Sequence, residues 1–181
     1  RGDVAVDTFR RAAYRRSGTE ASPGTKLFCL SGALVRPGTY EVAFGTTLRE
    51  LLALAGGVPE GGAVQAVLLG GAAGSFVGPD RLDLPLTFED TRTAGTTVGS
   101  GVVIVFDERA DVLDAVGRIA AFFRDESCGQ CVPCRVGTVR QEELLARLAA
   151  GRPRGTAQDE LALLRDLGQV MRDASICGLG Q

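Results

Sequence analysis

Residues 126–135 of this chain have the sequence ESCGQCVPCR, and residues 175–181 have the sequence SICGLGQ. The first stretch places three cysteines two residues apart, and the second supplies a distant fourth: Cys128, Cys131, Cys134 and Cys177. Two intervening residues let a tight loop turn its thiolates toward different irons of one cubane, and a distant cysteine completes the site. The pattern predicts a four-cysteine iron–sulfur site, and electron transfer is the function that such a site implies.

Two other uses of cysteine compete with this interpretation. A structural zinc ion also takes four cysteines, but usually as two separated C-x-x-C pairs, so this spacing suits a cubane better. Disulfides are disfavoured because the chain has five cysteines, an odd number, and nothing in it resembles a secretory signal. The fifth, Cys29, lies in the apolar run LFCLSG without a partner at ligand spacing, and we expect it to be a small buried residue.

Composition limits the remaining function classes. With 181 residues, 45% of them hydrophobic and 23% charged, the chain can bury a core, and we expect two small units. No apolar run approaches the roughly 18 residues needed to cross a bilayer. The net charge of −2 argues against a general nucleic-acid or membrane-surface binder. Histidine is absent, which excludes histidine triads and Rieske-type ligands, so any metal must be held mainly by thiolates.

The N-terminal residues 1–25 differ from the rest of the chain. They begin without methionine and end in the turn-rich run SGTEASPGT. Between these lies a basic cluster of Arg10, Arg11, Arg15 and Arg16. We expect the cluster to be a solvated helix face rather than a docking arm for an acidic partner, and the whole stretch to be a connector.

Residues 26–108 have the pattern of short strands around one helix. Thr47 and Glu50 form a capping box at the start of the helix, and Gly56 ends it. The last strand is nearly all apolar, and we expect it at the centre of the sheet. The strands are expected at residues 26–32, 63–71 and 100–108, and residues 35–42 are expected to form a tight turn at Pro37 and Gly38 that leads into one more strand. This order predicts a small β-grasp unit.

The glycine-rich run GGAAGSFVG, residues 70–78, lies between the last two of these strands. Glycines after a strand can bring backbone amides close to a phosphate, but a phosphate loop needs a helix directly behind it. Pro79 and Pro85 follow instead, so we expect a turn and an irregular loop without a nucleotide. A small soluble ligand of this loop stays an open alternative.

Residues 109–181 have helical periodicity. We expect Asp111 to cap a first helix that ends at the Ser127–Cys128 loop, and a second to run from about Arg135 to Gly151. Thr156 then caps a third, and the fourth cysteine follows it. Three helices are therefore expected to pack around the metal site.

Other residues of the cysteine stretches suit cluster chemistry. Gly129 and the glycines that flank Leu179 let backbone amides approach the sulfurs, and Pro133 stiffens the loop. Arg135 either adds positive charge near the cluster or is an ordinary surface arginine in the first turn of a helix.

These stretches also carry a family resemblance. GTEASPGTK, the strand-rich segment, and above all ESCGQCVPCRVGT with the later SICGLG resemble the C-terminal part of the NADH-oxidising flavoprotein subunit of respiratory complex I. NAD-dependent formate dehydrogenases and NAD-reducing hydrogenases have related subunits. The resemblance implies an α+β fold, with a ubiquitin-like β-grasp (SLBB) domain at 26–108 and an α-helical bundle at 109–181. That bundle would hold a [4Fe–4S] cluster on Cys128, Cys131, Cys134 and Cys177.

The departures from the family are equally informative. Members begin with a larger α/β domain that binds FMN and accepts NADH, and these residues contain no equivalent of it. We therefore expect residues 1–25 to be a connector from a missing FMN/NADH domain, and the chain to be a fragment or truncated product. It should contain no catalytic residue and no FMN or NAD site, so that it does not oxidise NADH alone. The flavin and NAD would belong to the parent subunit only.

Two hypotheses from different classes follow. In the first, the chain passes electrons from FMN through its cluster to iron–sulfur subunits of an NAD-linked oxidoreductase, in the cytoplasm or on the cytoplasmic face of a membrane complex. In the second, it is a β-grasp docking module with a structural zinc site and no redox role. The segment LDLPLTFEDTRTAGTTVGSGVVIVFDE resembles the formate dehydrogenase relatives at least as closely as complex I, although the sequence does not decide between the parents.

Overall fold

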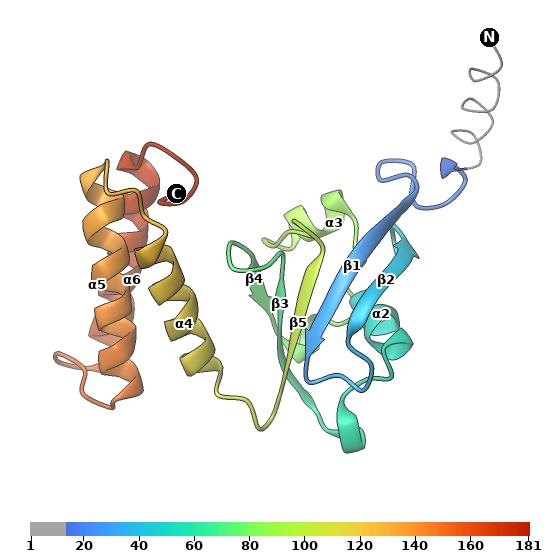
Figure 1. The fold of residues 1–181 in the computed structure, drawn as a ribbon, viewed down its shortest axis with the longest axis horizontal. Helices are drawn as coiled ribbons and strands as arrows, with labels where there is room; N and C mark the ends of the chain where they lie inside the picture. The colour runs from blue at the N-terminus through green and yellow to red at the C-terminus, as the bar shows by residue number, and fades with distance from the viewer. Residues whose placement is uncertain (1–13) are drawn as a thin grey trace, which may run out of the picture. The chain divides into compact units, whose positions relative to one another are not determined.

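The computed structural model describes residues 14–181, which form two compact units, one up to Ala110 and one of Asp111–Gln181 (Figure 1). A five-stranded sheet with short helices makes up the first unit and three long helices the second, so the predicted α+β fold class is confirmed. Arg10 and Arg11 lie outside the described residues. Within residues 14–181 no helix is long and apolar enough to cross a membrane.

The sheet has the mixed strand order β2-β1-β5-β3-β4. Its central strand β5 pairs parallel with β1 and antiparallel with β3, and the edge strands β2 and β4 pair antiparallel with β1 and β3. The strands are β1 Thr25–Gly32, β2 Gly38–Ala43, β3 Val64–Leu69, β4 Ser75–Val77 and β5 Val102–Asp107. This is the β-grasp topology, and β5 takes the central place that its apolar sequence predicts.

One face of the sheet builds the core with helix α2, Leu48–Leu54. Phe28 of β1 is 1% exposed, and Leu51 of α2 is fully buried. Burying a side chain of this size contributes roughly 1.5–3 kcal/mol to folding. The predicted capping box is present: the Thr47 backbone N–H donates to Glu50 at 2.8 Å, and the Thr47 hydroxyl accepts from the Glu50 N–H.

Two predictions in this unit are wrong. Cys29 is exposed rather than buried, because side chains of β1 alternate, and the positions that face the core are Phe28 and Leu30. The segment after the glycine turn is not wholly irregular, since Ser75–Val77 forms the short edge strand β4. Other short elements of this unit also had no sequence prediction: helix α3, Phe88–Thr93, and the 3-10 helices Pro59–Gly61 and Pro79–Arg81.

The described part of the N-terminal stretch is attached to the first unit. Thr19 and Ser22 both donate side-chain hydrogen bonds to the carboxylate of Glu89 on α3, the first at 3.0 Å. The Tyr14 hydroxyl donates to the backbone carbonyl of Thr25 at 2.8 Å. These contacts fix the entry into β1.

The second unit is a bundle of α4 Val112–Asp125, α5 Val132–Ala149 and α6 Ala157–Ala174 (Figure 1). Asp111 and Thr156 cap α4 and α6 as predicted, each accepting from the backbone N–H three residues later. The second helix begins at Val132 instead of near Arg135, because proline is tolerated in the first turn, where its missing N–H leaves no bond unmade.

A buried ion pair joins α5 and α6. Glu160 is 1% exposed and accepts two hydrogen bonds from the Arg147 guanidinium, at 2.8 and 2.7 Å, and one from the Arg154 backbone N–H at 2.7 Å. These bonds hold the end of α5 to the start of α6. Because the two helices form an antiparallel hairpin, the beginning of α5 lies near the end of α6, where the fourth cysteine follows.

Candidate metal centre

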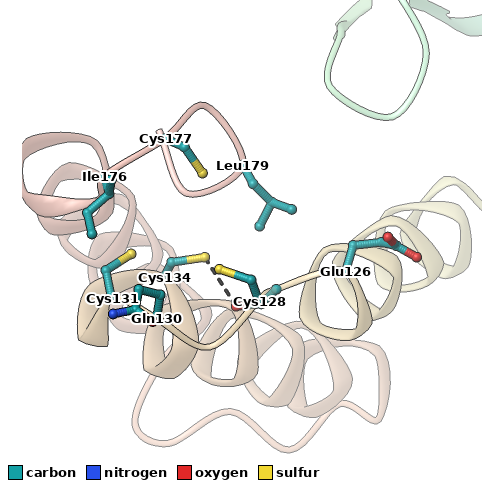
Figure 2. A pocket seen from close by; sticks show the side chains of 9 residues that line it. Glu126, Cys128, Gln130, Cys131, Cys134, Ile176, Cys177 and Leu179 are labelled. Atoms are coloured by element: carbon teal, nitrogen blue, oxygen red, sulfur yellow. Dashed lines mark hydrogen bonds between the residues drawn. The ribbon is translucent and has the colours of Figure 1, made fainter.

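The four predicted ligand cysteines come from three neighbouring segments of the helical unit. Cys128 lies in the loop after α4, Cys131 is the N-cap of α5, Cys134 lies in its first turn, and Cys177 lies in the turn after α6. All four line one cavity of about 320 Å³. Figure 2 shows Cys128, Cys131 and Cys134 on one side of this cavity, with Cys177 across from them.

The loop that carries Cys128 has a defined local geometry. Gly129 has φ of +74°, a left-handed conformation that glycine adopts without steric cost, and this reverses the chain between the first two cysteines. Arg135 is exposed, and its guanidinium donates to the Gly129 carbonyl at 3.1 Å. Arg135 therefore fastens the loop to α5, a role that its sequence position did not reveal.

The site favours negatively charged sulfur. Cys131 and Cys134 lie at the N-terminal end of α5, where unpaired backbone N–H groups and the helix dipole stabilise a thiolate. The pKa of the Cys131 thiol is lowered, mainly because the backbone N–H of Ile176 is directed at its sulfur. The Cys134 backbone N–H and the Ser175 hydroxyl lower it further. The thiolate is the form that binds a metal.

The arrangement offers space for a multi-atom metal cluster. The four cysteines line a cavity of about 320 Å³. Within residues 14–181 no group of three His, Cys, Asp or Glu side chains is close enough to hold one metal ion. In addition, the buried Ser175 hydroxyl, in a residue 7% exposed, has no hydrogen-bond partner and lies near enough to the Cys131 sulfur to affect its pKa. Four cysteine ligands and a hydroxyl that is free to donate a hydrogen bond suit an iron–sulfur cluster.

Several residues of the site had no sequence prediction. Ser127 contacts Cys134, with 3.4 Å between the Ser127 Oγ and Cys134 Sγ atoms, the dashed line of Figure 2. Ile176 and Leu179 line the cavity, and Ile176 is 74% exposed. The only sequence signal for the hydroxyls is their place beside the ligand motifs, in the runs ESC and SIC.

Two family models match this chain. The iron–sulfur binding region of the NADH-ubiquinone oxidoreductase F protein matches residues 114–181, and the SLBB domain matches residues 27–75. The first match contains all four cysteines of the cavity. The predicted SLBB and iron–sulfur domain content is therefore confirmed, and a [4Fe–4S] cluster is the cofactor of this region.

The chain is similar to several larger proteins. The F subunit of NADH-quinone oxidoreductase in Mycobacterium tuberculosis strain H37Rv is 39% identical over 167 residues, which is 92% of this chain and 37% of the relative. The HndC subunit of the NADP-reducing hydrogenase of Solidesulfovibrio fructosivorans is 38% identical over 91% of this chain and 33% of its own length.

A solved structure gives the same comparison in three dimensions. The crystal structure of an NAD⁺-reducing [NiFe]-hydrogenase in the H₂-reduced state matches 93% of this chain and 28% of the hydrogenase chain. The TM-score is 0.79 and the sequence identity 37%. The chain thus spans about a third of the length of these curated relatives.

Proposed function

We propose that Cys128, Cys131, Cys134 and Cys177 hold the [4Fe–4S] cluster of this chain, which matches the SLBB domain and the iron–sulfur binding region of the NADH-ubiquinone oxidoreductase F protein. A bound [4Fe–4S] cluster takes up and releases single electrons. The convergence of these cysteines on one cavity is the observation that carries the proposal. Cys29, the remaining cysteine, lies in β1 and contacts Thr39, so it is outside this set.

The residues around the cysteines would keep the bound form stable. The N-terminal end of α5 and the backbone N–H groups of Cys134 and Ile176 place positive partial charge beside the Cys131 sulfur. The 3.1 Å bond from Arg135 to the Gly129 carbonyl holds the Cys128 loop in place. Apolar Leu179 and Ile176 form part of the cavity wall, and the apolar surroundings of a cluster affect its potential.

We further propose that the chain acts within a larger NAD-linked oxidoreductase. Its relatives are, by their names, parts of NADH-quinone oxidoreductases and of hydrogenases that reduce NAD⁺ or NADP. In such a parent, a separate domain would bind FMN and NADH, and electrons would pass from the flavin through this unit to iron–sulfur centres of partner subunits. The parent would work in the cytoplasm or at the cytoplasmic face of a membrane complex. We also propose that residues 26–108 form the SLBB domain and residues 109–181 the iron–sulfur domain.

A series of cysteine variants tests the ligand assignment. The 181-residue chain and its Cys128→Ser, Cys131→Ser, Cys134→Ser and Cys177→Ser variants would be purified without oxygen and analysed for iron, acid-labile sulfide and zinc. We expect each of these variants to lose iron and sulfide, or to retain a degraded cluster, whereas the matched control Cys29→Ser keeps the wild-type content.

The outcomes separate the two hypotheses for the site. Loss of iron in the Cys29→Ser variant, or full iron after Cys177→Ser, would contradict the ligand set. One zinc per chain and no sulfide in the wild-type chain would overturn electron transfer, and would favour a docking module with a structural zinc site.

A further inference from the structure

We propose that the hydroxyl groups of Ser127 and Ser175 donate hydrogen bonds to the ligand sulfurs and thereby raise the reduction potential of the cluster. This inference rests on the proposed function, because it requires the four cysteines to hold the cluster. It assigns Ser127 to the Cys134 sulfur and Ser175 to the thiolates at the start of α5 as positioning residues, which do not bind iron themselves.

The hydrogen-bond geometry of Ser127 determines which atom donates. Its Oγ lies 3.4 Å from the Cys134 Sγ and also accepts from the Gly129 backbone N–H at 3.4 Å. A cysteine that binds iron is deprotonated and has no hydrogen to give. The Ser127 oxygen accepts from the Gly129 N–H through one lone pair, and its own hydrogen remains available. The Ser127 hydroxyl therefore donates to the Cys134 sulfur.

Ser175 has one unused polar group, its hydroxyl. Its backbone N–H donates to Met171 at 3.0 Å as the C-cap of α6, and its carbonyl accepts from the Gln181 side chain at 3.0 Å. The residue is 7% exposed, yet its Oγ has no partner. A buried hydroxyl without a partner costs free energy, so an acceptor beside it is expected.

The surroundings of Ser175 point to sulfur as that acceptor. Gly180 packs so closely that a Cβ built on it would lie 2.4 Å from the Ser175 Oγ and 2.9 Å from the Cys134 Cβ. Ser175 is therefore enclosed between the C-terminal turn and the cysteine cage. The Ser175 hydroxyl thus lies beside the start of α5, which carries Cys131 and Cys134. A thiolate held by iron offers the acceptor that the hydroxyl lacks.

The direction of the effect on the potential follows from charge. Reduction adds one electron to the cluster and its thiolates, which makes every sulfur a better acceptor. An O–H donor directed at a ligand sulfur therefore stabilises the reduced state more than the oxidised state, and it raises the potential. Neither hydroxyl caps a helix, because Ser127 follows the C-cap Glu126 and Ser175 caps α6 through its backbone alone. The Ser127 hydroxyl has one other contact, the 3.4 Å bond that it accepts from the Gly129 N–H.

The test is a redox titration of the 181-residue chain with its cluster in place, monitored by EPR, for the wild type and the Ser127→Ala and Ser175→Ala variants. Iron and sulfide content are measured on each sample first. Each variant should bind the same iron but have a lower midpoint potential. We expect up to about a tenfold change in the equilibrium between oxidised and reduced chains, or about 59 mV for one electron.

Control variants distinguish tuning from disturbance. Ser127→Thr keeps a hydroxyl and should retain the wild-type midpoint, and Ser100→Ala removes an exposed hydroxyl from the other unit and should change nothing. Full iron content with unchanged midpoints in both alanine variants would overturn the inference and leave the proposed function standing. Absence of iron and sulfide from the wild-type chain would instead refute the proposed function. If Ser175→Ala alone loses iron, the inference is tested by the midpoint potential of Ser127→Ala: a lowered potential supports the inference and an unchanged potential overturns it.

Discussion

Replacing Gly180 with alanine should damage the metal site, whereas the same change at Gly178 should not. A Cβ on Gly180 would lie 2.7 Å from the Ser175 Cβ and 2.9 Å from the Cys134 Cβ, whereas ordinary contact begins near 3.4 Å. Ser175 would have to move by about 0.7 Å and Cys134 by about 0.5 Å, and such overpacking costs about 1–3 kcal/mol. A preorganised metal site tolerates displacements of only about 0.5 Å, so a shift of this size should also weaken metal binding.

Gly178 provides the matched control in the same turn. A Cβ built on it has no atom within 4 Å, and neither glycine has a positive φ, so the two variants differ mainly in available space. Iron and sulfide per chain after anaerobic reconstitution and the urea unfolding midpoint would be measured for both. Gly180→Ala should bind less iron and unfold at lower urea than Gly178→Ala. Equal values for the two variants would refute the close packing of the C-terminal turn on Cys134.

Three further predictions concern folding. The pKa of Glu160 is lowered from 4.5 to about 2, first by hydrogen bonds from the Arg147 side chain and then by the Arg154 backbone N–H. The ionised carboxylate therefore stabilises the fold above pH 4.5, and this contribution is lost as the pH falls toward 2. The urea midpoint should therefore drop more steeply over that range for the wild type than for Glu160→Gln, and parallel pH profiles would contradict the ion pair. Leu144 is fully buried, so Leu144→Ala should lower the free energy of unfolding of the helical unit by about 2–5 kcal/mol, measured by urea titration. The control Leu163→Ala changes a side chain that is 45% exposed and should lower it by less than about 1 kcal/mol. Thr47→Ala removes the hydroxyl that caps α2 and should cost about 1 kcal/mol by thermal unfolding; an unchanged transition would show that the capping box contributes nothing.

Long periodic segments were predictable because their local signals agree with their tertiary packing. Asp111 and Thr156 mark the starts of α4 and α6, and apolar residues at three- and four-residue spacing indicate the helices between these caps and their ends. Burial follows this spacing only in part, because Met171 of α6 is buried whereas Val170 is 56% exposed. The apolar sequence of β5 likewise predicted its central position, since a strand with neighbours on both sides has little contact with water.

Features that depend on partners far away in sequence were not predictable. The strand β4 has three residues, and it forms because β3 is beside it. The apolar run around Cys29 suggested burial, but alternation along β1 leaves Leu27 59% exposed and Cys29 exposed as well. In the same way, α5 begins at Val132 because Pro133 fits a first helical turn, although the cysteine spacing suggested a loop there.

At the site, spacing predicted the cysteines but not their supporting contacts. The C-x-x-C-x-x-C spacing identifies Cys128, Cys131 and Cys134 without any structure. The contact of the Ser127 hydroxyl depends instead on how the loop before α5 folds over its first turn, and the place of Ser175 depends on how the α5–α6 hairpin brings the C-terminal turn to the start of α5. That placement is a property of helix packing, which a linear pattern does not contain.

Metal and sulfide analysis of the anaerobically purified 181-residue chain, followed by EPR after dithionite reduction, tests the central claim most directly. Four irons and four sulfides per chain, with the EPR signal of a reduced cluster, are the predicted result for a [4Fe–4S] centre. One zinc per chain without sulfide, and no signal on reduction, would contradict electron transfer through this unit.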